Sequence, residues 1–452
     1  MEDSKADSPT EEQQRRKGVN LGLVARTRGA DALCEALSHL TGPVFCSLYG
    51  LLVMLWLPIL CVSFLTHRNA TSTRSQAKSS KTHGNLSIEQ GGSRTAIAVL
   101  SMRATAASLG HGTDHIAPLL MAQLPFAGMN VMGTIYLSQI YQILTRAHFR
   151  LTSVTLNDFL AKVLQLPIGE CFMHSRTCFM DDTVTNFVHD MQRKGGTTEA
   201  NVVMLGAGYD TRLYRLHCFA KYNAANNSAH NPLAAGAGAG AGVGVGGGAA
   251  AAAGADTTKI NMYEVDAHGT QLEKRRVLLN AGIHTDHVTF VTVDFAAESW
   301  LDRLQQHGFD ASLPTCFIWE GITYYLTEEV LRENLAIFQQ FSEDSVIGLD
   351  YFGPWCREET MVRAMQAVGE PWHFYVRGDC GPESKHLHEL LHERFHFNIQ
   401  DNIDHVQCIN RYVPQHLDGR PIGHLGNFGG FVSMSPARAK ANREPCAACT
   451  KE

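Results

Sequence analysis

Several common catalytic and binding motifs are missing from this chain of 452 residues. No Gly-Lys-Ser/Thr follows its glycine-rich turn, which excludes a phosphate-binding P-loop there. Its 12 cysteines include no paired Cys-x-x-Cys sets at zinc spacing, and no Ser/His/Asp order or catalytic cysteine motif is present. A formal net charge of −6 argues against a primary role on nucleic acid. We therefore expect neither a metal site nor a nucleic-acid partner.

A glycine turn is the most informative feature that is present. The stretch Leu205–Arg212 reads Leu-Gly-Ala-Gly-Tyr-Asp-Thr-Arg and follows the apolar run 201–204. This order predicts a buried strand, a tight turn and a helix. Gly206 and Gly208 let the backbone approach a ligand, which would meet unpaired N–H groups at the start of the helix. In α/β folds an adenosine-containing cofactor binds at this position.

The residues beside the turn narrow the choice of cofactor. Thr211 stands where a dinucleotide fingerprint has a third glycine or alanine. Asp210 would repel a pyrophosphate, whereas it would attract a ligand that carries an ammonium or a sulfonium. At this point an ordinary strand-to-helix turn remains the alternative.

Acidic residues at the ends of three further predicted strands favour cofactor binding. The strands at 260–266, 287–293 and 315–319 end in, or are followed by, Asp266, Asp294 and Glu320, respectively. An acid at the end of the second strand suits the ribose hydroxyls, and Asp294 beside Phe295 suits an adenine. A single acid could be a solvated strand end, but the repetition after a glycine turn indicates a binding crevice.

Together these motifs resemble the leucine carboxyl methyltransferase family, and within it a branch of S-adenosylmethionine-dependent methyltransferases common in actinobacteria. The resemblance spans roughly residues 93–435 and is specific through the combination of its motifs. Its segments are Ser93–Ala96, Met102–Ala104, Ser175–Asp182, Leu205–Arg212, Tyr263–Asp266, Ile318–Glu329 and Gly369–Trp372.

The resemblance implies S-adenosyl-L-methionine as cofactor and an α/β fold, a Rossmann-like class I methyltransferase sheet with an N-terminal helical cap. It also implies a role for individual residues. The cofactor-binding set is the turn Gly206, Ala207, Gly208 and Asp210 under the methionine part, Asp266 or nearby Glu264 at the ribose, Asp294 and Phe295 at the adenine, Glu320 after the fourth strand, and Arg176 with Arg103 at the cofactor's carboxylate. Phe295 departs from the leucine of the family but keeps an apolar body.

Methyl transfer is an in-line displacement that mainly requires alignment and exclusion of water. A carboxylate acceptor needs no general base, whereas a hydroxyl or an amine does. Glu320, Tyr325 and His174 are the candidate bases; Glu320 is favoured as a cofactor ligand, and His174 as an ordinary helix-surface residue. The expected function is O-methylation of a carboxylate or hydroxyl on an unidentified acceptor. The alternatives are a catalytically inactive, membrane-anchored scaffold and an NAD-type dehydrogenase.

The N-terminal region contains a candidate membrane anchor. Residues 43–65 carry no charge over about 23 residues, which is long enough for a helix to span a bilayer. The run lies too far along the chain for a cleaved signal peptide, so it predicts a signal anchor, with a buried core helix as the alternative. Basic residues after the run place the catalytic domain in the cytosol, although sequons at Asn69 and Asn85 would be used in the lumen. We predict a single-pass membrane protein.

The chain is expected to divide into five segments. They are a polar, disordered segment at 1–42, the anchor at 43–65, a linker at 66–92, a methyltransferase domain at 93–435 and a disordered tail at 436–452. Within the domain, an insertion at 222–258 contains an almost pure alanine and glycine tract at 234–255, which is expected to form a mobile loop. Cys446 and Cys449 in the tail could bind a metal or respond to redox state, but a chance spacing is favoured.

The remaining pattern completes the predicted sheet. Further strands are expected at 345–352, 395–400 and 428–434, with the last inserted antiparallel beside the sixth. A helix is expected at 356–368, and residues 93–194 should be mostly helical.

Overall fold

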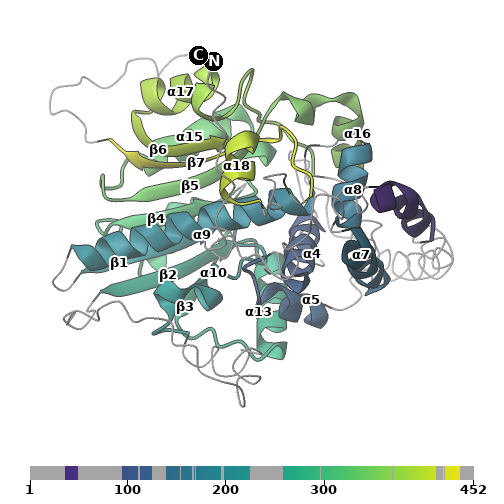
Figure 1. Cartoon of the computed structure of the whole chain (residues 1–452). Coiled ribbons are helices and arrows are strands. Elements are labelled where there is room, and N and C mark those ends of the chain that lie inside the picture. Colours follow the sequence, from purple (N-terminus) through teal and green to yellow (C-terminus); the bar gives the residue numbers. More distant parts are fainter. Residues whose placement is uncertain are drawn as a thin grey trace, which may run out of the picture.

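The computed structural model describes most of the domain predicted at 93–435 and one short N-terminal helix (Figure 1). The described residues are 36–48, 94–109, 112–124, 139–164, 167–194, 198–223, 258–368, 370–413 and 421–437, apart from positions 153, 168, 296 and 422. Most of the predicted anchor at 43–65, the Ala/Gly tract at 234–255 and the cysteine pair in the tail lie outside these residues.

A seven-stranded sheet in the order β3-β2-β1-β4-β5-β7-β6 forms the centre of the molecule (Figure 1). The strands are β1 (Glu199–Leu205), β2 (Lys259–Asp266), β3 (Val288–Thr292), β4 (Thr315–Trp319), β5 (Val346–Phe352), β6 (Phe397–Asp404) and β7 (Gly429–Pro436). The first five strands pair in parallel, while β7 lies antiparallel between β5 and β6. The predicted parallel sheet and the antiparallel last strand are therefore confirmed.

Helices cover both faces of the sheet. They are α4 (Arg94–Ser108), α5 (Ala117–Gln123), α7 (Gln139–Thr152), α8 (Leu156–Val163), α9 (Glu170–Arg193), α10 (Arg212–Arg215), α13 (His268–Asn280), α14 (Trp300–Gln306), α15 (Glu328–Phe338), α16 (Glu359–Val368), α17 (Lys385–His388) and α18 (His405–Arg411). Short turns of helix are η1 (His217–Phe219), η2 (Thr323–Tyr325), η3 (Pro354–Arg357), η4 (Gly381–Glu383) and η5 (Glu389–Arg394). The helices α4, α5, α7, α8 and α9 confirm the predicted helical region before β1.

The strand pattern of β1 explains the two hydrophobic layers. Successive side chains of a strand point to opposite faces, so Val202 and Met204 enter one layer and Val203 and Leu205 the other. All four residues are buried, as expected for a central strand of a parallel sheet with helices on both faces. The near-continuous apolar run at 201–204 was therefore a reliable signal of a doubly covered strand.

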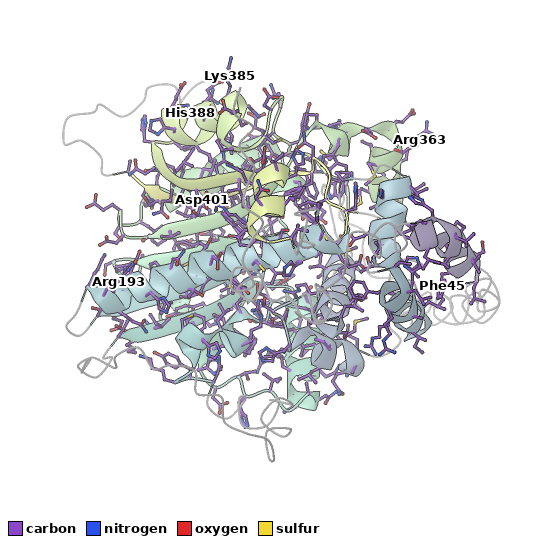
Figure 2. All side chains as sticks on the ribbon, viewed as in Figure 1. Phe45, Arg193, Arg363, Lys385, His388 and Asp401 are labelled. Atoms are coloured by element: carbon purple, nitrogen blue, oxygen red, sulfur yellow. The ribbon has the colours of Figure 1, made fainter. Side chains whose placement is uncertain are left out.

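The long helix α9 crosses the face that carries the first layer (Figure 1). Sixteen of its 24 residues are buried, because it packs against β4, β5 and β7 on one side and against α4 on another. Its N-terminus lies at the end of the sheet where the parallel strands terminate, together with α4, α5 and α16 (Figure 1). The outer surface is charged, as Arg193 and Arg363 illustrate (Figure 2).

Three predicted elements differ from those observed. The helix after the glycine turn is only four residues long, and β6 begins two residues later than predicted and extends to Asp404. The expected helix at 356–368 begins at Glu359, after the turn η3. Within the described part of the chain, no helix combines the length and the apolar character needed to cross a bilayer.

Candidate active site

The glycine turn adopts a left-handed backbone conformation at two positions. Gly206 has φ of 69° and Gly208 has φ of 45°, a region that residues with a Cβ rarely adopt. A Cβ at Gly206 would lie 1.9 Å from Cδ1 of Ile322, so a side chain there is also excluded by contact. The N–H groups of Gly206 and Ala207 donate to the carbonyl of Val265 at 2.8 and 3.0 Å. The turn is thus fixed to β2 by these two N–H groups.

Asp266 lies between the end of β2 and the glycine turn. Its Oδ2 accepts a hydrogen bond from the N–H of Gly208 at 2.5 Å, and its Oδ1 accepts one from Ala267 at 2.6 Å. Burial raises the pKa of Asp266, while the two backbone donors lower it in part. Each carboxylate oxygen has a second lone pair, so the group can still accept hydrogen bonds from a diol. The position agrees with the predicted ribose-binding role.

Glu264 is placed differently from Asp266. It lies inside β2, 1% exposed, and its Oε2 is 2.8 Å from Nζ of the equally buried Lys274 on α13. Burial raises the pKa of Glu264 to about 7, although Lys274 acts in the opposite direction. Glu264 therefore forms a buried ion pair with Lys274, and its carboxylate does not lie at the end of the strand.

Arg176 on α9 joins the ends of β4 and β5. Its Nε is 2.9 Å from Oε1 of Glu320, and its Nη1 is 2.9 Å from Oδ2 of Asp350. Nη1 also donates to the hydroxyl of Tyr324 at 3.3 Å. The guanidinium is 2% exposed, so two protein carboxylates already balance its charge. The cofactor carboxylate assigned to Arg176 would be a third anion beside it.

Arg212, which directly follows the turn, makes the second set of ion pairs. Its Nη1 is 2.7 Å from Oε2 of Glu320, its Nε is 2.8 Å from Asp181, and it also pairs with Asp210. Burial alone would raise the pKa of Asp210, but Arg212 and Arg103 lower it to about 2. Asp210 is therefore ionised, and its charge is already paired with Arg212. It is not available to bind a cationic ligand as the sequence had suggested.

The same network continues into the N-terminal helices. Arg215 contacts Asp181 at 2.7 Å and Asp114 at 3.5 Å. Arg103 on α4 lies 3.6 Å from Asp114 and donates to the carbonyl of Tyr209, within the turn region, at 2.6 Å. The N-terminal helices are thus tied by charge to the segment that follows β1.

The network contains one more carboxylate than guanidinium groups. Among the described residues it joins Arg103, Arg176, Arg212 and Arg215 to Asp114, Asp181, Asp210, Glu320 and Asp350. Burial would raise the pKa of Glu320, but Arg212 and Arg176 lower it overall, so this carboxylate is ionised. Five carboxylates against four guanidinium groups give the network a formal charge of −1, which favours a cation over an anion nearby.

Asp294 and Phe295 follow β3 at a more exposed edge. The N–H of Asp294 donates to the carboxylate of Glu298 at 2.9 Å, and Phe295 is 42% exposed. An exposed phenyl ring beside a carboxylate is compatible with a stacked adenine. Both residues lie next to the end of β2, as predicted, because β2 and β3 pair in parallel up to Asp266 and Thr292.

Neither Tyr325 nor His174 has the environment of a general base. Burial raises the pKa of Tyr325, whose side chain also hydrogen-bonds to Thr95 and Trp372. His174 is 4% exposed, with Nε2 3.2 Å from the carbonyl of Tyr412, and burial lowers its pKa to about 4. The prediction that His174 lies on a helix surface is therefore wrong.

The ionic network was the main feature that sequence reasoning missed. Arg212 stood in the quoted glycine motif and Asp181 in the upstream segment, but neither received a role. Asp114, Arg215 and Asp350 carried no signal of their own, because each lies in a different element and only the fold brings them together.

The central part of the chain matches the model of a known protein family. The model of the family described as leucine carboxyl methyltransferase matches residues 145–225 and 246–339. These two segments make up about two fifths of the chain and contain β1 to β4, Arg176 and the strand-end acids. No curated protein matches the chain.

Several solved structures match this chain at low sequence identity. A DUF574 family protein from Streptomyces avermitilis is 12% identical, with 62% of this chain and 89% of that chain covered and a TM-score of 0.36. Magnesium protoporphyrin IX methyltransferase from Synechocystis, with bound S-adenosylhomocysteine, is 10% identical, with 59% and 87% covered and a TM-score of 0.29. The O-methyltransferase NcsB1 from neocarzinostatin biosynthesis is 11% identical, with 79% and 100% covered and a TM-score of 0.27.

Proposed function

We propose that this chain, which over residues 145–225 and 246–339 belongs to the leucine carboxyl methyltransferase family, methylates an oxygen of its acceptor. It is an S-adenosylmethionine-dependent methyltransferase; the oxygen acceptor, a carboxylate or a hydroxyl, is our proposal. The observation that carries it is the carboxyl edge of the sheet, where the glycine turn, Asp266, Asp294 and Glu320 follow four adjacent parallel strands.

The described residues fit the cofactor at two points. Asp266 offers two oxygens beside the glycine turn for a ribose, whereas the space next to Gly206 in the turn is occupied by Ile322. The ionic network around Glu320 has a formal charge of −1, which complements a sulfonium. When bound, S-adenosylmethionine supplies a methyl group on a positively charged sulfur, which makes it electrophilic.

The state of the candidate bases favours a carboxylate acceptor. Glu320 is ionised but paired with Arg176 and Arg212, so its affinity for a proton is low. Tyr325 has a raised pKa and remains protonated near neutral pH, so it can donate a hydrogen bond but cannot remove a proton. A carboxylate is already nucleophilic at neutral pH and does not need either group. The contribution of the protein is then alignment and exclusion of water.

Calorimetry with the full chain tests the cofactor, and radiolabelling tests the acceptor. Heat of binding with S-adenosylmethionine but not with NAD is expected, and the reverse would restore the dehydrogenase alternative. Membranes from cells with and without the protein are then incubated with a tritiated methyl donor. Base-labile label indicates methyl esters and supports a carboxylate, whereas base-stable label points to ethers or amines and contradicts it.

The predicted anchor at 43–65 belongs to this proposal, because it would hold the enzyme at a membrane with its catalytic domain in the cytosol. What supports it is the uncharged sequence of the segment.

A further inference from the structure

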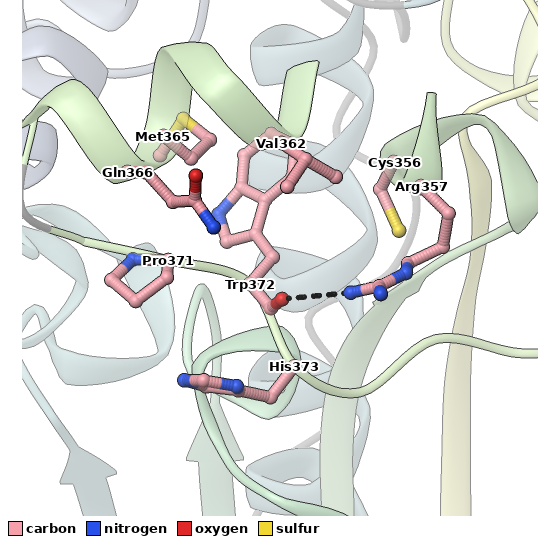
Figure 3. Close-up of a pocket in the computed structure, with 8 residues that line it drawn as sticks. All are labelled: Cys356, Arg357, Val362, Met365, Gln366, Pro371, Trp372 and His373. Carbon is pink, nitrogen blue, oxygen red and sulfur yellow. Dashed lines mark hydrogen bonds between the residues drawn. The ribbon is translucent and has the colours of Figure 1, made fainter. Parts of the chain in front are cut away.

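A small pocket lies at the carboxyl edge of the sheet, between α16 and the segment 371–373 (Figure 3). Its volume is about 240 Å³, enough for a small ring but not for a complete cofactor. The pocket lies beside the end of β5, because the short helix η3 (Pro354–Arg357), which comes directly after that strand, forms part of the pocket wall.

The walls of the pocket combine a flat apolar surface with a cation. Trp372 faces Val362 and Met365 of α16, and Pro371 closes one side (Figure 3). Arg357 lies at the rim, exposed, with Nη1 3.4 Å from the carbonyl of Trp372. No carboxylate in the described part of the chain forms an ion pair with Arg357, in contrast to the buried arginines of the ionic network.

Backbone contacts fix the pocket to the candidate active site. The N–H groups of His373 and Phe374 donate to the carbonyl of Tyr324 at 2.7 and 3.3 Å. The ring of Trp372 lies 4.8 Å from Phe352, which stacks on Tyr324 at 4.0 Å. The hydroxyl of Tyr324 in turn accepts a hydrogen bond from Arg176. Contacts between the rings of Trp372, Phe352 and Tyr324 therefore connect the wall of the pocket to Arg176, one of the residues assigned to the cofactor.

We propose that this pocket binds the anionic end of the methyl acceptor, a group carried on a flat apolar body and distinct from the group that is methylated. The ring packs on Trp372, and the anion pairs with Arg357. The inference rests on the proposed methyltransferase function, because it assigns the pocket to the acceptor of that reaction. It gives the acceptor a chemical class: a small aromatic or similarly flat acid with a second oxygen function.

Benzoate, with benzamide as its neutral counterpart, is a suitable probe. Titration calorimetry with the full chain is expected to show binding of benzoate about two- to fivefold tighter than that of benzamide, as expected for an ion pair with an exposed arginine. Arg357→Gln should remove this preference. Gln366→Glu, at an exposed residue of the pocket, should weaken benzoate by adding a like charge. Arg363→Gln, at an exposed arginine on the same helix, is the matched control and should change nothing.

The outcomes separate this inference from the proposed function. If S-adenosylmethionine binds the wild type but benzoate shows no preference over benzamide, or a preference that Arg357→Gln leaves intact, the pocket assignment is wrong and the methyltransferase proposal stands. If benzoate binds as expected and S-adenosylmethionine does not bind, the proposed function fails, and with it the assignment of this anion pocket to a methyl acceptor. Arg357→Gln should leave the affinity for S-adenosylmethionine unchanged, which excludes loss of folding.

Discussion

Asp266 is the residue that we propose to bind the ribose of the cofactor, because the N–H groups of Gly208 and Ala267 hold its two oxygens in position. Asp266→Asn keeps the shape and one acceptor oxygen but removes the charge. Its affinity for S-adenosylmethionine, measured by calorimetry, should fall about tenfold, as expected for a hydrogen bond to a charged group. Glu273→Gln, on the neighbouring helix α13, removes only a surface pair with Arg276 and serves as control. Equal affinities for both variants would contradict the ribose role.

The substitution Arg212→Met tests how much the ionic network contributes to the free energy of unfolding. Arg212→Met removes the partner of three carboxylates that are largely or fully buried, and leaving a buried charge unpaired costs about 3–5 kcal/mol. Urea unfolding should show a loss of this size. Arg193→Met breaks only an exposed pair and should change the free energy of unfolding by about 0.5 kcal/mol or less. A small effect of Arg212→Met would mean that water enters the network.

His174 predicts a pH dependence of stability. Its pKa is lowered from 6.5 to about 4 in the folded protein, so the folded state binds fewer protons than the unfolded state between these values. The contribution to stability is present above pH 6.5 and is lost as the pH falls toward 4. Relative to His174→Gln, which cannot be protonated, the wild type should lose about 2 kcal/mol between pH 6.5 and 5. If the stability of the two proteins changes with pH in the same way, His174 is protonated as easily in the folded protein as in the unfolded protein.

At the scale of elements, sequence pattern predicted what depends on local periodicity. The apolar run of β1 and the glycine turn were found because a doubly buried strand and a tight turn each have a local signature. The four-residue length of α10 and the start of β6 were not, since both depend on packing against distant segments. The residues Asp114 and Asp350 were missed for the same reason: their role comes from arginines on other elements.

The Ala/Gly tract at 234–255 provides a prediction about an element outside the described residues. It separates η1 from β2, yet β1 and β2 pair in register from Glu199 to Leu205. Deleting the tract should therefore leave the affinity for S-adenosylmethionine within about twofold, since neither the turn nor Asp266 is altered. A deletion variant that folds, by circular dichroism, but no longer binds would show that the tract takes part in the site.

At the scale of the whole molecule, the anchor that we propose at 43–65 would hold the enzyme at a membrane. The full chain should stay with membranes through extraction at alkaline pH, which releases peripheral proteins. Replacing two residues of the apolar run, as in Leu51→Lys with Leu55→Lys, should release it, because charged side chains are costly in a bilayer. Glycosidase treatment should leave the gel mobility unchanged. A mobility shift would instead place Asn69 or Asn85 on the luminal side.

The ionic network has a consequence for how the protein can be divided. Arg103 and Asp114 lie on or beside the first helices of the described domain, whereas Arg212 and Glu320 belong to the sheet region. A fragment that starts at β1 would retain all seven strands and the glycine turn. It would nevertheless lack Arg176 and Asp181, so Asp350 would lose the arginine it pairs with, while Glu320 and Arg212 would keep each other but lose Arg176 and Asp181, respectively. The ionic network at the carboxyl edge is thus built from the N-terminal helices as much as from the sheet, and a fragment without those helices should be less stable than the full chain.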